Sequence, residues 1–233
     1  MDRAVLVAFC GAAGTGKTTL VNSLGERFQD EGLRVRVISE VARRVFHTYF
    51  GWYKSLAEIR ESENMYFFFQ NKVAHEQICQ EKIMVKSGVD LVLSDRSVLD
   101  NLVYTLIWCR KKPELTFFEH YLETVFEWAY VRRPYDLMFY VPPFGEKVDD
   151  GFRTQDLEDQ VTQDQLIQML CSGLSVPVIS TEPGERVDEV YTVIQEMIKE
   201  RKTTRIEKGG IENEKGLIAN GLQDSAMFHC FGR

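Results

Sequence analysis

The sequence has no long apolar segment, little proline and few cysteines. Its first apolar run, Ala4–Cys10, follows Asp2 and Arg3 and is only seven residues long, which is too short for the centre of a signal peptide or for a membrane span. The cysteines are scattered, with no close pair to clamp a metal and an odd total that cannot pair completely. They are Cys10, Cys79, Cys109, Cys171 and Cys230. We therefore expect a cytoplasmic chain with free thiols and no membrane partner.

Positive charge is also scarce. The chain has 28 Lys and Arg against 35 Asp and Glu, a net charge of -7, and so lacks the basic face that a nucleic-acid backbone requires. The four histidines lie far apart, without the spacing of zinc ligands. Hydrophobic residues make up 44% and charged residues 27% of the 233 positions, close to the average for soluble domains. The composition favours one globular domain and argues against nucleic acid and zinc.

Short β-branched runs alternate with segments of helical spacing. In residues 18–30, for example, Leu20, Leu24 and Phe28 recur every four residues, and Gly32 follows as a stop signal. This alternation predicts an α/β fold, with a five-stranded parallel sheet and helices on both faces. The predicted strands are residues 5–10, 33–39, 89–94, 137–141 and 176–180. The predicted later helices are residues 55–86, 98–110, 114–132, 155–171 and 185–201.

The composition changes near residue 202. Beyond it, glycine is frequent and apolar residues are few, so the segment buries too little surface to offset its chain entropy. We expect a folded domain over residues 1–202 and a flexible tail over residues 203–233.

A phosphate-binding motif follows the first predicted strand and opens the first predicted helix. Residues 11–18 read GAAGTGKT and fit the pattern G-x-x-x-x-G-K-[ST] in the strand–loop–helix context that this motif requires. The glycines let backbone N–H groups and the positive end of the helix face a phosphate. Lys17 adds a point charge at the β and γ phosphates, and the hydroxyl of Thr18 is a candidate ligand for Mg²⁺. The predicted nucleotide-binding residues are Gly11, Ala12, Ala13, Gly14, Thr15, Gly16, Lys17, Thr18 and Thr19.

Charged residues follow the next two predicted strands, where ligands of open α/β sheets bind. Glu40 follows the second strand, where it is either a general base for an attacking hydroxyl or a carboxylate that complements a helix dipole. Asp95 follows the third strand and is either a second Mg²⁺ anchor or a helix cap. Arg96 beside it is placed to reach a phosphate of the donor or the acceptor.

The long polar loop over residues 142–153 is a candidate lid. Arg153 at its end is either an arginine that covers the transferred phosphoryl group or a surface residue paired with Asp149 or Asp150.

These motifs resemble the NadR-like ATPase/kinase domain family, which includes the nicotinamide riboside kinase module and is related to deoxynucleoside and thymidylate kinases. The resemblance rests on residues 11–18, 39–43, 94–97, 148–153 and 184–187 and spans about residues 3–200. It supports Glu40 as the base and Arg96 as a site residue, and it makes Gln70 a candidate for gripping a planar base. The chain departs from nicotinamide riboside kinases, which tend to have Asp-Thr-Asp where this sequence has Ser94-Asp95-Arg96, so their substrate is not carried over.

The sequence thus predicts an ATP- and Mg²⁺-dependent phosphotransferase that phosphorylates a small nucleoside-like or vitamin-like acceptor. Lys17, Glu40, Asp95, Arg96 and Arg153 are its candidate catalytic residues, with Thr18 and Asp95 as Mg²⁺ ligands. A regulatory ATPase without an acceptor and a polynucleotide 5′-hydroxyl kinase are the alternatives. No Asn-Lys-x-Asp guanine reader is present, which favours ATP over GTP.

Overall fold

The computed structural model describes residues 3–108, 115–144, 157–174, 176–179, 182–201 and 203. The chain divides into two compact units, Met1–Val190 and Tyr191–Arg233. The described residues of the second unit, 191–201 and 203, are helical. The segment expected to be a tail, 203–233, lies outside the described residues except for position 203.

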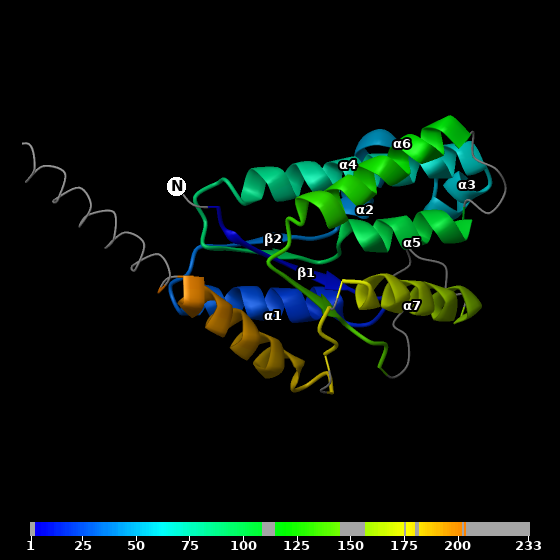
Figure 1. Ribbon diagram of the computed structural model, residues 1–233. Helices are drawn as coiled ribbons and strands as arrows, with labels where there is room; N and C mark the ends of the chain where they lie inside the picture. Colours follow the sequence, from blue (N-terminus) through cyan, green and yellow to red (C-terminus); the bar gives the residue numbers. More distant parts are fainter. Residues whose placement is uncertain are drawn as a thin grey trace, which may run out of the picture. The chain divides into compact units, whose positions relative to one another are not determined.

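The first unit is built on a parallel sheet of four strands (Figure 1). The strands are β1 (Val5–Cys10), β2 (Val35–Ile38), β3 (Leu91–Ser94) and β4 (Leu137–Tyr140), in the spatial order β2-β3-β1-β4. All six residues of β1 are buried, as expected for a central strand covered on both faces. Because all pairings are parallel, the carboxyl ends of the four strands lie at one edge of the sheet.

The prediction of a fifth strand is wrong. Of the predicted strand 176–180, the described residues 176–179 form an isolated bridge instead of a strand, in which Tyr140 N donates to Pro177 O (2.9 Å) and Ile179 N donates to Tyr140 O (3.0 Å). Pro177 has no N–H group, so this segment cannot donate a hydrogen bond at that position and is restricted to the edge of a sheet. The α/β class and the parallel sheet are confirmed.

Helices cover both faces of the sheet (Figure 1). Leu6 and Val92 pack with α2 and α4 in one core cluster, and Ala8 and Cys10 pack with α5 and α7 in another, while α1 packs on the opposite face. The helices of this unit are α1 (Lys17–Asp30), α2 (Val41–Tyr49), α3 (Leu56–Arg60), α4 (Glu63–Met84), α5 (Val98–Trp108), α6 (Leu115–Phe126), the π-helix η1 (Glu127–Arg132) and α7 (Leu157–Ser172). Among the described residues, no helix is long and apolar enough to cross a membrane.

The helix expected over residues 55–86 is divided into α3 and α4. Ser55 caps α3 by accepting a hydrogen bond from Glu58 N (3.3 Å), and Ser62 caps α4 by accepting one from Met65 N (3.4 Å). A serine N-cap favours the start of a new helix over continuation of the previous one. The break at residues 61–62 lets α4 run as a separate 22-residue helix.

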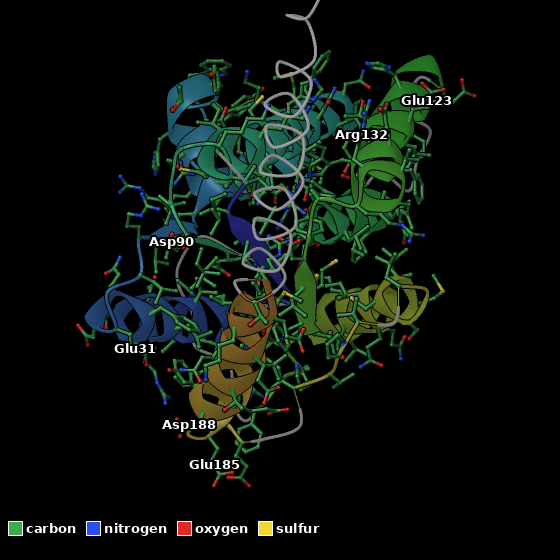
Figure 2. The ribbon with its side chains drawn as sticks, turned by 60° about the vertical axis from the view of Figure 1, so that its left-hand side comes forward. Glu31, Asp90, Glu123, Arg132, Glu185 and Asp188 are labelled. Carbon is green, nitrogen blue, oxygen red and sulfur yellow. The ribbon has the colours of Figure 1, made fainter. Side chains whose placement is uncertain are left out.

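Exposed ion pairs lie on the outer surface. Arg34 pairs with Asp90 (2.9 Å) and Arg132 with Glu127 (2.9 Å), and Figure 2 shows Asp90 and Arg132 at the periphery of the fold. Exposed pairs of this kind stabilise proteins by about 1 kcal/mol or less. Their loss should therefore destabilise the protein much less than the loss of a buried charge.

Candidate functional site

The phosphate loop connects β1 with α1. At Gly11 a Cβ atom would lie 2.5 Å from Val141 O, a distance at which no side chain fits. Gly16 is the N-cap of α1 and has a left-handed φ of 84°, which glycine adopts without strain. Because Gly16 has no side chain to cap α1, the first N–H groups of the helix are left to bind an anion.

Lys17 is held within this loop. It is 4% exposed, and its Nζ donates hydrogen bonds to Ala12 O (2.6 Å) and Thr15 Oγ1 (2.9 Å). The ammonium group thus lies over the concave side of the loop that a phosphate would occupy. The structure brings Lys17 and the loop amides together, as the motif predicts.

Two further contacts fix the outer side of the loop. Arg186 donates to Thr15 O (3.0 Å) and Pro142 O (3.1 Å), and Gln160 of α7 donates to Ala13 O (2.7 Å). Arg186 is 4% exposed and belongs to the segment 184–187 that the family resemblance singled out. Its two hydrogen bonds link the phosphate loop at Thr15 to Pro142, just after β4.

Thr18 and Asp95 meet although they are 77 positions apart in the sequence. Thr18 Oγ1 donates to Asp95 Oδ2 at 2.5 Å, because β3 lies beside β1 and ends next to the start of α1. A hydroxyl and a carboxylate are oxygen ligands that suit Mg²⁺, which takes few protein ligands and keeps several waters. Within the described ranges, no group of three or more His, Cys, Asp or Glu side chains could hold a metal, so a site of many protein ligands is not formed there.

Arg96 lies beside Asp95 in an unusual conformation. Its φ is 127°, and strained backbone of this kind clusters at functional sites. Its guanidinium lies 5.2 Å from the centre of the Tyr104 ring and 3.6 Å from Asp100 Oδ1. Burial alone would lower the pKa of Arg96, but Tyr104, Asp100 and Asp95 outweigh it and raise the pKa above its ordinary value. Arg96 therefore carries its charge at all relevant pH values.

Asp100 joins the phosphate loop to the turn that carries Asp95 and Arg96. It is completely buried; its Oδ1 accepts a hydrogen bond from Gly11 N (3.0 Å), and its Oδ2 accepts from Ser97 N and Ser97 Oγ (both 3.0 Å). Asp100 was not among the candidate residues predicted from the sequence. The signal was present, because residues 97–100 read SVLD and fit the capping-box pattern at the start of a helix.

Glu40 stands at the start of α2 with a left-handed φ of 54°. Its carboxylate pairs with Arg43 Nε at 3.2 Å, and both side chains are more than one-third exposed. Glu40 and Asp95 line the same pocket. The structure thus brings Glu40 to the site with Asp95 and Arg96, whereas Arg153 lies outside the described residues.

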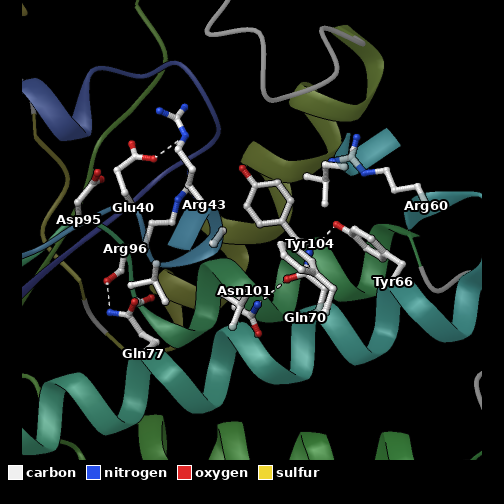
Figure 3. Close-up of a pocket in the computed structure, with 16 residues that line it drawn as sticks. Glu40, Arg43, Arg60, Tyr66, Gln70, Gln77, Asp95, Arg96, Asn101 and Tyr104 are labelled. Carbon is white, nitrogen blue, oxygen red and sulfur yellow. Dashed lines mark hydrogen bonds and ion pairs between the residues drawn. The ribbon is translucent and has the colours of Figure 1, made fainter. Parts of the chain in front are cut away.

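This pocket opens beside the phosphate loop at the carboxyl ends of β2 and β3 and holds about 750 Å³, open space at its mouth included. Figure 3 shows its polar side chains projecting over α4 and α5. They include Glu40, Arg43, Gln70, Asp95, Arg96 and Tyr104. The pocket has the few convergent polar groups typical of small-molecule sites.

Gln70 lines the pocket, but its amide group is held by neighbours. Its Nε2 donates to Tyr66 OH (2.6 Å), and its Oε1 accepts from Asn101 Nδ2 (2.5 Å). Asn101 in turn accepts from Tyr121 OH (2.6 Å). This chain of buried hydrogen bonds ties α4 to α5 and α6 and includes Asn101 and Tyr121, which our sequence analysis did not single out.

A buried carboxyl group, Glu81 of α4, lies behind the pocket. Glu81 is completely buried and accepts hydrogen bonds from Gln77 Nε2 (2.8 Å), Trp128 Nε1 (2.6 Å) and Tyr135 OH (3.1 Å). Gln77 also donates to Ser94 Oγ (2.7 Å), so Glu81 supports the end of β3. Burial raises the pKa of Glu81 to about 7, against the opposing effect of its three donors.

We predict a pH-dependent stability that Glu81→Gln removes. Between the ordinary value of 4.5 and about 7, the folded protein keeps a proton that the unfolded chain releases, so stability falls as the pH rises through this window and levels off above it. The fall is on the order of 3 kcal/mol. Urea unfolding at pH 5, 6, 7 and 8 measures it. The Glu81→Gln protein should lack this slope and the Glu76→Gln control on the same helix should keep it; equal slopes in wild type and Glu81→Gln would refute the assignment.

Comparisons with known proteins agree with this geometry. A family model described as an AAA domain matches residues 6–188. The structure is similar to one titled "Crystal structure of NadR protein in complex with NR", with a TM-score of 0.61 and 22% sequence identity over 83% of this chain. This chain covers 51% of that protein, about half its length. A search of curated proteins found no match. The likeness confirms the NadR-like P-loop fold that the motifs predict.

Proposed function

The chain belongs to the AAA domain family, and we propose that it is a kinase that transfers the γ-phosphoryl group of ATP to a small nucleoside-like or metabolite acceptor. One observation carries the proposal. Asp95 contacts Thr18 of the phosphate loop (2.5 Å) and also lines the neighbouring pocket. The phosphate loop and the neighbouring polar pocket therefore share a residue, as transfer between two bound molecules requires.

The charged residues of the site are proposed to have different roles in the reaction. The amides of the phosphate loop and Lys17 bind the β and γ phosphates and stabilise charge that develops on the transferred group, while Arg96 lines the neighbouring pocket beside Asp95. Thr18 and Asp95 would hold Mg²⁺, which offsets negative charge on the phosphates when it is bound. Arg153, which lies outside the described residues, is proposed as a further cation for the transferred group.

Glu40 is proposed to orient and deprotonate the acceptor hydroxyl. Its carboxylate is partly exposed, lines the pocket and pairs with Arg43, which places it where an acceptor would bind. We predict that Glu40→Gln lowers kcat by about 10²-fold with little change in KM for ATP. Steady-state kinetics test this, with Glu58→Gln on α3 as the control. If Glu40 only complements the dipole of α2, kcat should stay at the wild-type value and stability should fall by about 0.3–1 kcal/mol.

The acceptor is testable with γ-labelled ATP, Mg²⁺ and a library of nucleosides, nucleotides and vitamins. Label transferred to one acceptor supports the kinase. Phosphate release at the same rate with and without every acceptor would instead indicate a regulatory ATPase. Label on a 5′-hydroxyl oligonucleotide but on no small molecule would indicate a polynucleotide kinase. Absence of nucleotide binding in calorimetry would reject the whole assignment.

A further inference from the structure

The pocket is more positive than the chain around it. Three arginines line it, Arg43, Arg60 and Arg96, against two carboxylates, Glu40 and Asp95. The whole chain carries a net charge of -7. Asp95 also contacts Thr18 at the phosphate loop, so part of the negative charge in the pocket is directed toward the nucleotide. A local excess of positive charge in an acidic protein favours an anionic ligand.

Two buried donors in this pocket lack a hydrogen-bond acceptor. Among the residues that the structure describes, neither Arg96 Nη1 nor the Tyr104 hydroxyl has a hydrogen-bond partner. Arg96 Nη1 lies 3.6 Å from Asp100 Oδ1, which is beyond hydrogen-bond length. Buried polar atoms without partners are rare in folded proteins and are costly unless a ligand or water satisfies them.

The two donors belong to side chains that contact each other. The Arg96 guanidinium packs against the Tyr104 ring, 5.2 Å from its centre. Figure 3 shows the Tyr104 ring in the middle of the pocket, with Arg43 and Arg60 on either side of it in this view. Gln70 cannot supply a comparable free polar end, because Tyr66 and Asn101 bind its amide nitrogen and oxygen.

An oxyanion suits these donors better than a neutral group does. Phosphate and carboxylate oxygens accept several hydrogen bonds at once, and bonds between charged partners are about twice as strong as neutral ones. A neutral amide or hydroxyl would satisfy one donor but would add no counter-charge for Arg96 beyond Asp100 and Asp95.

We infer that the acceptor carries an oxyanion, a phosphate or a carboxylate, which Arg96 and the Tyr104 hydroxyl bind inside the pocket. The inference rests on the proposed function, since it takes the pocket to be the acceptor site. It narrows the substrate class from nucleoside-like molecules in general to anionic ones, such as phosphorylated nucleosides or metabolite acids.

The test uses the full chain saturated with Mg²⁺ and a non-hydrolysable ATP analogue, so that the γ-phosphate position is filled. Phenyl phosphate, benzoate and benzyl alcohol are titrated separately into this complex and followed by calorimetry. At least one of the two anions should bind ten times or more tightly than benzyl alcohol, and the tighter of the two identifies phosphate or carboxylate. Equal affinity of all three probes would overturn the inference and show that the free donors serve the nucleotide or water.

The Tyr104→Phe variant distinguishes a loss of anion binding from a loss of protein stability. Because its hydroxyl has no partner in the described part of the chain, its removal should leave Tm unchanged while it weakens the preferred anion by about 10- to 100-fold. Benzyl alcohol should bind as before, and Tyr49→Phe, outside the pocket, should change neither property. Anion binding that survives Tyr104→Phe at full strength would overturn the inference. The same titrations are repeated without nucleotide. Failure of the ATP analogue to bind would overturn the proposed function, whereas anion binding that depends on Tyr104 in the absence of nucleotide would still support the anion site itself.

Discussion

Replacing Lys17 by alanine should lower kcat/KM for ATP by roughly 10³- to 10⁴-fold, because two charge-assisted hydrogen bonds to phosphate oxygens are lost at about 1.5–3 kcal/mol each. The ammonium is already positioned over the loop by Ala12 O (2.6 Å) and Thr15 Oγ1 (2.9 Å). Phosphate oxygens replace these partners without a large rearrangement of the side chain. Calorimetry with ATP and Mg²⁺, followed by initial-rate kinetics, separates the loss of binding from the loss of turnover.

Charge alone should not rescue this position. Lys17→Arg keeps the charge but replaces the ammonium with a larger planar group. There is little space for it, because even a Cβ atom added to Gly11 would lie 3.5 Å from Lys17 Nζ. The arginine variant should therefore recover little activity. Lys72→Ala, on α4 and with its ammonium over the Tyr49 ring, is the control and should keep wild-type kinetics. A Lys17→Ala protein that binds ATP at wild-type affinity would show that the loop does not hold the triphosphate.

The parts of the site formed by residues close together in the sequence could be predicted from the sequence. The phosphate loop is one continuous segment, and its glycines and lysine act within a few residues of one another. The meeting of Thr18 with Asp95 also follows, because parallel strands bring their carboxyl ends to one edge of the sheet and β3 is the neighbour of β1. The alternating pattern predicted the fold class but not the order of the strands in the sheet.

The parts that depend on tertiary packing could not be predicted. The family resemblance makes Gln70 a candidate for gripping a planar base, yet Asn101 on the next helix donates to its oxygen and Tyr66 accepts from its nitrogen. Pairing between helices depends on how α4 and α5 rotate against each other, which periodicity does not determine. The absence of a regular fifth strand was predictable from Pro177, because proline has no N–H group to donate a hydrogen bond to the neighbouring strand.

Backbone strain at the pocket had no signal in the sequence. Glu40 and Arg96 are two of the three described non-glycine residues with positive φ, and both line the pocket. Each follows a strand and contributes its side chain to the pocket lining. Because such conformations persist only where surrounding contacts impose them, the contacts that hold Arg96 should be as important as Arg96 itself.

Asp100 supplies those contacts, and its loss should have the largest effect on stability. Asp100→Ala leaves Gly11 N and Ser97 N without their buried acceptor and removes the carboxylate that faces Arg96 at 3.6 Å. Removing one partner of a buried charged network costs about 3–5 kcal/mol, a large part of the 5–15 kcal/mol that stabilises a typical domain. Urea unfolding monitored by circular dichroism measures the change. Asp90→Ala, which breaks only the exposed pair with Arg34, should cost about 1 kcal/mol or less.

Asp100→Asn separates the effect of charge from that of shape and remains informative if the alanine variant does not fold. The amide oxygen can still accept from Gly11 N, but the amide nitrogen then faces the N–H and hydroxyl of Ser97. Arg96 also loses its counter-charge. We therefore expect a folded protein with a smaller loss of stability and at least tenfold weaker ATP binding, because residue 100 no longer bridges Gly11 and Ser97 and the Thr18–Asp95 hydrogen bond is left to link the loop to this turn. Wild-type affinity in Asp100→Asn, together with an alanine variant destabilised by less than about 1 kcal/mol, would show that the two segments are positioned independently.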